Sequence, residues 1–247
     1  DRSPSRGLGD VYKRQAQDYP AERFEVIIVD DSSDGGEDLW RRLTSSAPGH
    51  RLAGRLRYLH APPDPERGRL GTKRNVAVEA ARGEVIAIWD DDDFYAPQRL
   101  RRQSAVMAQC AGDIVMLDQS GCEPLLHYFD ASSGVFSQVT KSSLAQPCAM
   151  AYRRSLWGPG ASRYPPGRDV FEDLIFFDSL LAHGARVNVA SVPWVRVRHS
   201  ANMVVDYSDA GARETIVDDD AVVSRVGLSG DTLAFLHGLA DSERSNV

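Results

Sequence analysis

Four consecutive aspartates, Asp90–Asp93, follow an apolar run at residues 85–89 and constrain the fold more than any other feature. A short apolar run with β-branched residues predicts a strand buried on both faces, as inside a parallel sheet. Ligands of open α/β sheets bind beyond the carboxyl ends of such strands. Carboxylates this close repel one another unless a cation lies among them, and hard oxygen ligands suit Mg²⁺ or Mn²⁺. For an isolated run of acids, a solvated turn is the alternative.

Composition narrows the class of protein. The chain has 247 residues, of which 42% are hydrophobic and 26% charged, as in globular proteins. Its formal net charge of −6 argues against a nucleic-acid partner. We find no apolar stretch long enough for a transmembrane segment and no signal peptide. The cysteines, Cys110, Cys122 and Cys148, form no zinc or disulfide pattern, so we expect structural roles and a cytoplasmic location, with peripheral attachment to the inner face of the membrane left open.

A second acidic strand end lies upstream. Residues 24–29 predict another buried strand, and it ends in Asp30 and Asp31 before a turn rich in serine and glycine. Further on, Thr72 is the predicted N-cap of a helix that runs to Arg82. Its first turn carries Lys73 and Arg74, and cations beside free backbone N–H groups are a natural site for phosphate. Two solvated basic residues are the alternative.

The remaining elements follow from periodicity and turn signals. Helices are predicted at 37–43, 97–109 and 172–183, and strands at 55–59, 114–117, 148–152, 186–189 and 193–199. Residues 118–147 show no clean period, and the polar stretch from Ser200 predicts loop with one or two helices. We find no internal repeat and no second-domain boundary.

Taken in order, these segments resemble a family-2 glycosyltransferase of the GT-A fold. The resemblance covers about residues 16–205 and rests on motifs that begin at Ala16, Val26, Lys73, Ala80, Asp90, Phe171 and His199. It implies an α/β, Rossmann-like, mostly parallel sheet flanked by helices. We therefore expect a leader at 1–15, one glycosyltransferase domain at 16–205, and a helical or irregular C-terminal tail at 206–247.

The resemblance also implies an activity. It is the transfer of a sugar from a nucleotide-diphosphate donor to a hydroxyl acceptor, with inversion at the anomeric carbon and with Mn²⁺ or Mg²⁺ as cofactor. The acceptor is open: a glycan, a lipid-linked glycan or a small molecule.

Donor-binding roles carry over by position. The resemblance implies that Asp31 binds the base with support from Asp30, and that Lys73 and Arg74 lie near the diphosphate. Asp90, with Asp91 beside it, faces the ribose or the sugar.

Metal-binding and catalytic roles carry over in the same way. The resemblance implies that Asp92 binds the metal, that His199 joins the metal or the diphosphate, and that Asp93 braces the loop. Asp173 is the implied general base, with Glu172 beside it; its spacing to Phe176, Phe177 and Leu180 predicts that it lies on the apolar face of its helix. The alternatives are a simple N-terminal helix acid for Asp173 and core packing for His199.

Residues 1–15 depart from the family pattern. The family places an apolar strand and a helix there, whereas this stretch has neither period and resembles translated sequencing-adaptor sequence. We expect it to be non-native or disordered, with about 30 native residues of a βα unit missing upstream of Ala16. Two other functions stay open: a nucleotidyltransferase, which would need a Gly-rich basic loop after the first strand, and a non-catalytic nucleotide-sugar-binding remnant.

Overall fold

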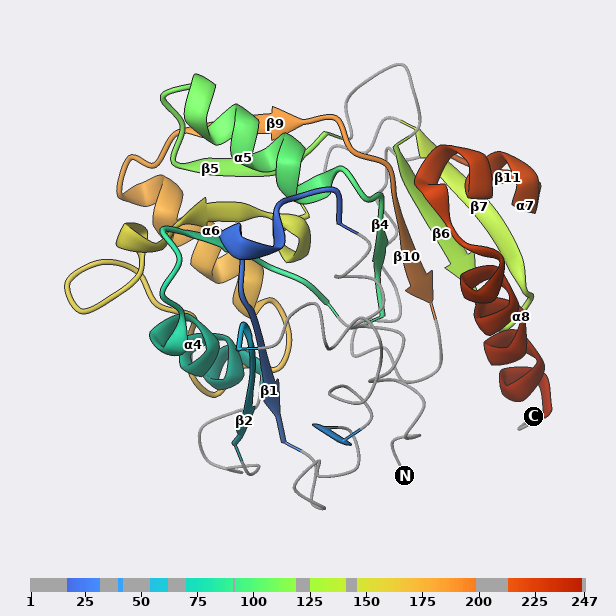
Figure 1. The fold of residues 1–247 in the computed structure, drawn as a ribbon, viewed down its shortest axis with the longest axis horizontal. Coiled ribbons are helices and arrows are strands. Elements are labelled where there is room, and N and C mark those ends of the chain that lie inside the picture. Colours follow the sequence, from blue (N-terminus) through green and yellow to red (C-terminus); the bar gives the residue numbers. More distant parts are fainter. Residues whose placement is uncertain are drawn as a thin grey trace.

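The computed structural model describes residues 17–31, 40–41, 54–61, 70–90, 92–118, 125–140, 146–198 and 213–245. Asp91, His199 and the predicted leader lie outside these ranges. Within them, sheets and helices alternate along the chain (Figure 1), which confirms the predicted α/β class.

The first strands form a small parallel sheet. β1 (Val26–Asp30) pairs with β2 (Leu56–His60) in the register Val26 to Leu56. β2 was predicted within one residue at each end, whereas β1 starts two residues later than predicted. The parallel pairing brings the acidic end of β1 to the same edge as the end of β2, and α4 (Leu70–Ala80) packs against β1.

A four-stranded sheet carries the central acidic segment. Its order is β3 (Val85–Ala87), β8 (Ala151–Arg153), β5 (Ile114–Leu117) and β9 (Val187–Ala190). The prediction that the apolar run before the aspartates is a parallel strand buried on both faces is wrong: β3 pairs antiparallel with β8, and Val85 is 36% exposed. Burial begins only at Ile88, after the strand, where the chain enters the core.

A five-stranded sheet forms the other half of the molecule (Figure 1). Its order is β11 (Arg213–Val217), β7 (Val135–Thr140), β6 (Leu126–Asp130), β10 (Trp194–Arg198) and β4 (Phe94–Tyr95). The pair β6–β10 is parallel and the other pairs are antiparallel. The segment 118–147, which had no clean period, thus supplies the β6–β7 hairpin.

The prediction of a mostly parallel sheet needs correction, because the described sheets are mixed. Only the pairs β1–β2, β6–β10 and β5–β9 are parallel among the described strands. The tight turn at residues 131–134 can join only antiparallel strands. β8 is antiparallel to both β3 and β5, so it interrupts the parallel order of its sheet.

Helices cover the sheets. They are α4, α5 (Arg99–Gln109), α6 (Glu172–Ala182), the short α7 (Asp219–Val222) and α8 (Gly230–Ser245). Short 3₁₀ turns occur at Ala21–Arg23, Pro147–Ala149 (η2) and Arg154–Leu156, and a π-helical turn at Val223–Gly227. The predicted C-terminal tail contains strand β11 as well as helices, and Leu236 and Ala240 of α8 are fully buried in the core beside β6 and β10.

The start of α4 is set by a tertiary contact rather than by its own sequence. Thr72 is not the N-cap, because the helix already includes Leu70, whose N–H donates to Asp169 Oδ1 at 3.0 Å. Next to it, a Cβ on Gly71 would lie 2.2 Å from the Pro165 carbonyl oxygen, so only glycine fits this approach. The loop at 165–169 therefore positions Lys73 and Arg74.

A buried polar pair on α5 ties the centre of the fold together. Arg99 Nη2 donates to the Ile88 and Ala149 carbonyls at 2.5 and 3.0 Å, and Gln103 Nε2 donates to the Val115 and Ala149 carbonyls at 2.9 and 3.0 Å. Arg99 is fully buried. These bonds hold the end of β3 against the turn η2, and both segments lead into the cluster described next.

Candidate active site

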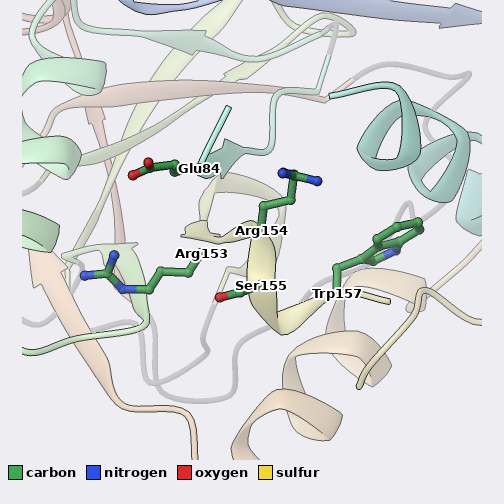
Figure 2. Close-up of a pocket in the computed structure, with 5 residues that line it drawn as sticks. All are labelled: Glu84, Arg153, Arg154, Ser155 and Trp157. Atoms are coloured by element: carbon green, nitrogen blue, oxygen red, sulfur yellow. The ribbon is translucent and has the colours of Figure 1, made fainter. Parts of the chain in front are cut away.

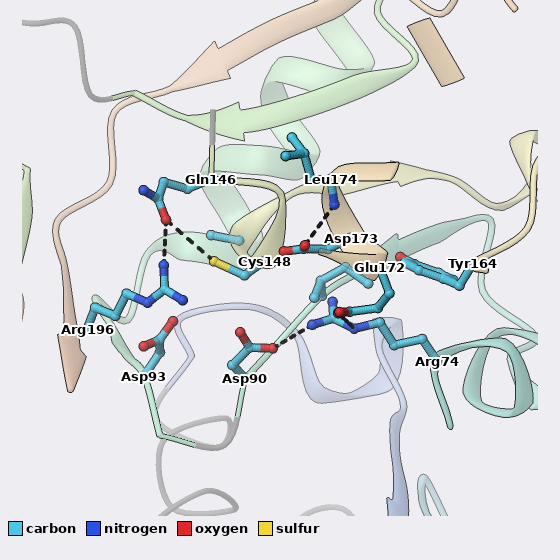
Figure 3. Close-up of polar contacts among 12 residues, drawn as sticks. Arg74, Asp90, Asp93, Gln146, Cys148, Tyr164, Glu172, Asp173, Leu174 and Arg196 are labelled. Carbon is cyan, nitrogen blue, oxygen red and sulfur yellow. Dashed lines mark hydrogen bonds and ion pairs between the residues drawn. The ribbon is translucent and has the colours of Figure 1, made fainter. Parts of the chain in front are cut away.

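Arg74 lies at the centre of a charged cluster at the ends of β3 and α6 (Figure 3). Its Nη2 contacts Asp90 Oδ1 at 3.1 Å and its Nε contacts Glu172 Oε1 at 3.0 Å. Its side chain is 10% exposed, and Nη1 is buried without a hydrogen-bond partner in the described part of the chain. A buried guanidinium N–H left open in this way is suited to an anionic ligand.

The electrostatics of this cluster follow from burial and from mutual contact. Burial raises the pKa of Glu172 to about 7 against the opposing charge of Arg74, and it raises the pKa of Asp90 to about 6. Burial alone would lower the pKa of Arg74, but the charges of Asp90 and Glu172 outweigh it and raise that pKa. Arg74 thus stays charged, and its positive charge favours the ionised forms of Asp90 and Glu172.

The two acids at the start of α6 occupy different environments. Glu172 is 2% exposed and shares the buried face with Phe176 and Leu180. Asp173 is only partly buried, and its Oδ1 accepts from the Leu174 N–H at 2.7 Å. The prediction that Asp173 lies on the apolar face is therefore wrong, since Glu172 takes that place.

The acids at the end of β1 form a separate group. Asp31 pairs with Lys73 Nζ at 3.1 Å, and Asp30 Oδ2 accepts from the Tyr58 hydroxyl at 2.5 Å. Lys73 thus neutralises the acid implied to bind the base, whereas Arg74, its neighbour on α4, contacts Asp90. The two predicted diphosphate cations are divided between two acidic groups.

A third group surrounds Asp93. Its Oδ2 accepts from the Tyr95 hydroxyl at 2.9 Å, and burial raises its pKa well above the usual range, with the charge of Asp92 adding to the effect. Arg196, on β10, donates to Gln146 Oε1 at 2.6 Å and lies beside Asp93 in Figure 3. Arg196 was not among the predicted residues.

The described residues fit a divalent cation. Asp90, Asp93 and Cys148 each offer one ligand atom, and these atoms lie within 4.8 Å of one another. Asp93 is 1% exposed, and its Oδ1 has no hydrogen-bond donor among the described residues. A buried carboxylate oxygen is costly without a donor or a cation. Asp92 lies in the same loop, while His199 is outside the described residues, so the predicted ligand pair stays a prediction.

Sequence reasoning missed Arg196, Cys148 and Tyr164. Arg196 alternates with the buried Val195 and Val197, so its place on the opposite strand face was a usable signal. Tyr164 is fully buried, and Arg74 lies 5.7 Å from the centre of its ring. No local pattern marks Tyr164 or Cys148, because their neighbours come from distant strands.

A hollow lies at the start of β3, away from the charged cluster around Arg74 (Figure 2). It is lined by Glu84, Arg153, Arg154, Ser155 and Trp157. Its arginines already bond to the backbone. Arg153 donates to the Gly112 and Met107 carbonyls at 3.3 Å each, and Arg154 Nε donates to the Gly83 carbonyl at 2.9 Å. No predicted site residue lines this hollow, so the charged cluster around Arg74 is the candidate active site.

The pKa of Glu172 predicts a pH dependence of stability. Because burial raises it from 4.5 to about 7, the folded state binds more protons than the unfolded state between these values. The free energy of unfolding should then fall by roughly 1–3 kcal/mol as pH rises through this interval. We expect the melting temperature, measured in EDTA, to decrease from about pH 5 to about pH 8.

The matched variant for this prediction is Glu172→Gln, which keeps an oxygen for Arg74 but does not titrate. It should make the melting profile less steep in that interval, where Asp90, whose pKa burial also raises, accounts for part of the remaining slope. A wild-type melting temperature that rises with pH, or an equal slope in the variant, would contradict the assignment to Glu172.

Comparisons with known proteins show which proteins this chain is similar to. The family model described as glycosyl transferase family 2 matches residues 11–155, more than half of the chain. The chain belongs to glycosyl transferase family 2. Residues from β1 to β8, including Lys73, Arg74 and Asp90, lie inside the matched region of this family-2 chain.

Two curated relatives of this family-2 chain are similar to it over different shares of its length. The succinoglycan biosynthesis protein ExoO of Rhizobium meliloti is 29% identical over 227 residues, which cover 83% of this chain and 61% of ExoO. The poly(ribitol-phosphate) β-N-acetylglucosaminyltransferase TarS of Staphylococcus aureus is 27% identical over 105 residues, which cover 42% of this chain and 17% of TarS. The chain therefore spans less than two thirds of these relatives.

Solved structures support the fold. The crystal structure of S. aureus TarS 1–349 in complex with UDP-GlcNAc is similar to this chain, with a TM-score of 0.58 at 16% identity. The similarity covers 96% of this chain and 68% of that one. Another TarS crystal structure gives a TM-score of 0.59 at 18% identity and covers 78% of this chain and 34% of that one. These likenesses confirm the predicted GT-A fold. Among the described residues, none of the helices has the length and apolar character needed to cross a membrane.

Proposed function

We propose that this chain is a metal-dependent, inverting glycosyltransferase that moves a sugar from a nucleotide-diphosphate donor to an acceptor hydroxyl. The observation that carries the proposal is the position of Arg74. Arg74 contacts Asp90 and Glu172 through Nη2 and Nε, its Nη1 is buried without a partner among the described residues, and Asp173 follows Glu172 in this family-2 chain. An anion-binding cation thus adjoins an accessible carboxylate.

The donor is proposed to be a uridine-diphosphate sugar. TarS structures were solved with UDP and with UDP-GlcNAc, and this chain shares their fold. Asp31 and Asp30, at the end of β1, are the proposed partners of the base and its support. The names of TarS and ExoO refer to poly(ribitol phosphate) and succinoglycan, which favours a glycan as the acceptor.

The chemistry follows from the charges. Negative charge develops on the diphosphate as the glycosidic bond breaks, and Arg74 is placed to stabilise it in a site with little solvent. Asp90, Asp92 and Asp93 would hold the divalent cation, which would neutralise further charge on the leaving group. Lys73 contributes indirectly, because it neutralises the charge of Asp31.

Inversion requires one displacement with a base on the opposite face of the sugar. In the proposed step Asp173 takes the proton of the acceptor hydroxyl. The acceptor oxygen bonds to the anomeric carbon as the bond from that carbon to the diphosphate oxygen breaks. Glu172 is paired with Arg74, so its proposed role is to hold that cation in place rather than to accept the proton.

The first test is metal-dependent donor binding. We expect calorimetric titration to show UDP-sugar binding that needs Mn²⁺ or Mg²⁺ and that is lost in EDTA and in Asp92→Ala. Asp178→Ala, an exposed acid on α6, is the matched control and should bind as the wild type does. Equal affinity with and without EDTA in both variants would exclude a metal-dependent donor site.

Product analysis separates the competing functions. A glycosyltransferase releases a nucleoside diphosphate, whereas a nucleotidyltransferase releases pyrophosphate. A non-catalytic remnant would bind donor and release neither. A mass-spectrometric screen of donors against glycan acceptors would give the sugar and the acceptor. The predicted cytoplasmic location rests on cysteine usage alone and stays a prediction.

A further inference from the structure

The register of β3 and β8 brings Cys148 to the acidic loop. The strands are antiparallel, with Val85 opposite Arg153 and Ala87 opposite Ala151. The ladder continues past β3, because the Ile88 N–H donates to the Met150 carbonyl at 2.9 Å. Beyond this bond the chain forms the turn η2 (Pro147–Ala149), which contains Cys148, and its Sγ lies within 4.8 Å of a carboxylate oxygen of Asp90 and of Asp93.

The segment that carries Cys148 is firmly held. Cys148 lies in the buried turn η2, and the carbonyl of the next residue, Ala149, accepts from both Arg99 and Gln103 at 3.0 Å. On its other side, Gln146 is bonded to Arg196. The segment around the thiol is therefore held by neighbours from α5 and β10.

A second observation points to a ligand at this position. Asp93 Oδ1 is buried without a hydrogen-bond donor in the described structure, and one carboxylate oxygen of Asp93 lies within 4.8 Å of the ligand atoms of Asp90 and Cys148. The thiol donates to Gln146 Oε1 at 3.9 Å, an acceptor that also accepts from Arg196. Two carboxylates and a thiol thus converge on one point (Figure 3).

We propose that Cys148 Sγ is a direct ligand of the divalent cation, together with Asp90 and Asp93. This rests on the metal dependence in the proposed function and adds a soft ligand to its oxygen set. Thiolates prefer Zn²⁺, Co²⁺ and Cd²⁺, while Mg²⁺ prefers oxygen alone. The site therefore takes borderline and soft divalent ions more tightly than Mg²⁺. On binding, the thiol proton passes to solvent as the sulfur–metal bond forms, with no change in oxidation state.

The experiment is a titration of the whole chain with Co²⁺, alone and with UDP, followed by absorption. Ligation by Cys148 predicts a thiolate-to-cobalt charge-transfer band in the near ultraviolet, which saturates with the calorimetric binding of Co²⁺. Cys148→Ser should lose the band, and Cd²⁺ should displace Co²⁺ far more readily than Mg²⁺ does. Cys110→Ser, which removes an exposed free thiol, and Cys122→Ser are the matched controls and should keep the band.

The outcomes are distinct. Co²⁺ binding without the band, or a band that survives in Cys148→Ser, overturns the role of Cys148 and leaves metal-dependent transfer standing. Absence of Co²⁺ binding, with and without UDP, overturns both. Cys148→Ala, checked by circular dichroism and thermal melting, guards against loss of folding: a folded Ala variant that binds Co²⁺ as tightly as the wild type also overturns the proposal.

Discussion

Asp173→Asn should lower sugar transfer by about 10²–10⁴-fold and leave UDP-sugar affinity nearly unchanged. The substitution keeps an Oδ1 that can accept from the Leu174 N–H, so the start of α6 is preserved. It removes only the ability to take a proton. Because a general base acts in the chemical step, the loss should appear in kcat rather than in donor binding, as measured by nucleoside diphosphate release and by calorimetry.

Two other variants on the same helix are compared with Asp173→Asn. Asp178→Asn changes an exposed acid five residues on and should retain full transfer. Glu172→Gln tests the neighbouring carboxylate, whose pairing with Arg74 makes it a positioning residue. If Asp173→Asn keeps more than roughly a tenth of the wild-type turnover, the base lies elsewhere and Glu172 is the next candidate.

Arg99→Leu should lower the free energy of unfolding by about 3 kcal/mol or more. The variant leaves two buried carbonyls, of Ile88 and Ala149, without their charged donor, and a hydrogen bond to a charged group contributes roughly 1.5–3 kcal/mol. The guanidinium is also stacked on Trp89 and Tyr95, at 4.4 and 3.8 Å from their ring centres. Chemical denaturation monitored by circular dichroism measures the loss.

The control for this prediction is Arg102→Leu, an exposed arginine on the same helix, which should change stability by less than about 0.5 kcal/mol. Gln103→Leu shares the Ala149 carbonyl with Arg99, so the double variant should lose less than the two single variants added together. Equal stability of the Arg99 and Arg102 variants would show that the buried bonds contribute little.

The two predictions are connected through the same loops. Arg99 and Gln103 hold the end of β3 and the turn η2, and these carry Asp90 and Cys148. Loosening that contact in a folded variant such as Gln103→Leu should therefore weaken cation binding as well as stability. The charged cluster around Arg74 depends on α5 although α5 contributes no residue to it.

Several features of this protein were determined by the sequence itself. The apolar runs that end in Asp30 and Asp90 placed two strand ends, and α5 and α6 followed from local periodicity and lie within two residues of their predicted starts. Local patterns suffice here because each element has its own signal of alternating or helical spacing. The ordered motifs indicated the family, which the family model then confirmed.

Only the tertiary structure decided how these pieces meet. The antiparallel β3–β8 pairing and the turn η2 brought the Cys148 thiol within 4.8 Å of an Asp90 carboxylate oxygen, and Asp169 capped α4 from almost a hundred residues away. Burial of Glu172 rather than Asp173 depended on how α6 rests on the core, a rotation that a spacing of 3.6 residues per turn leaves open between neighbours. Contacts between distant segments carry no local period, so the sequence determined which residues take part and the packing decided which of them touch.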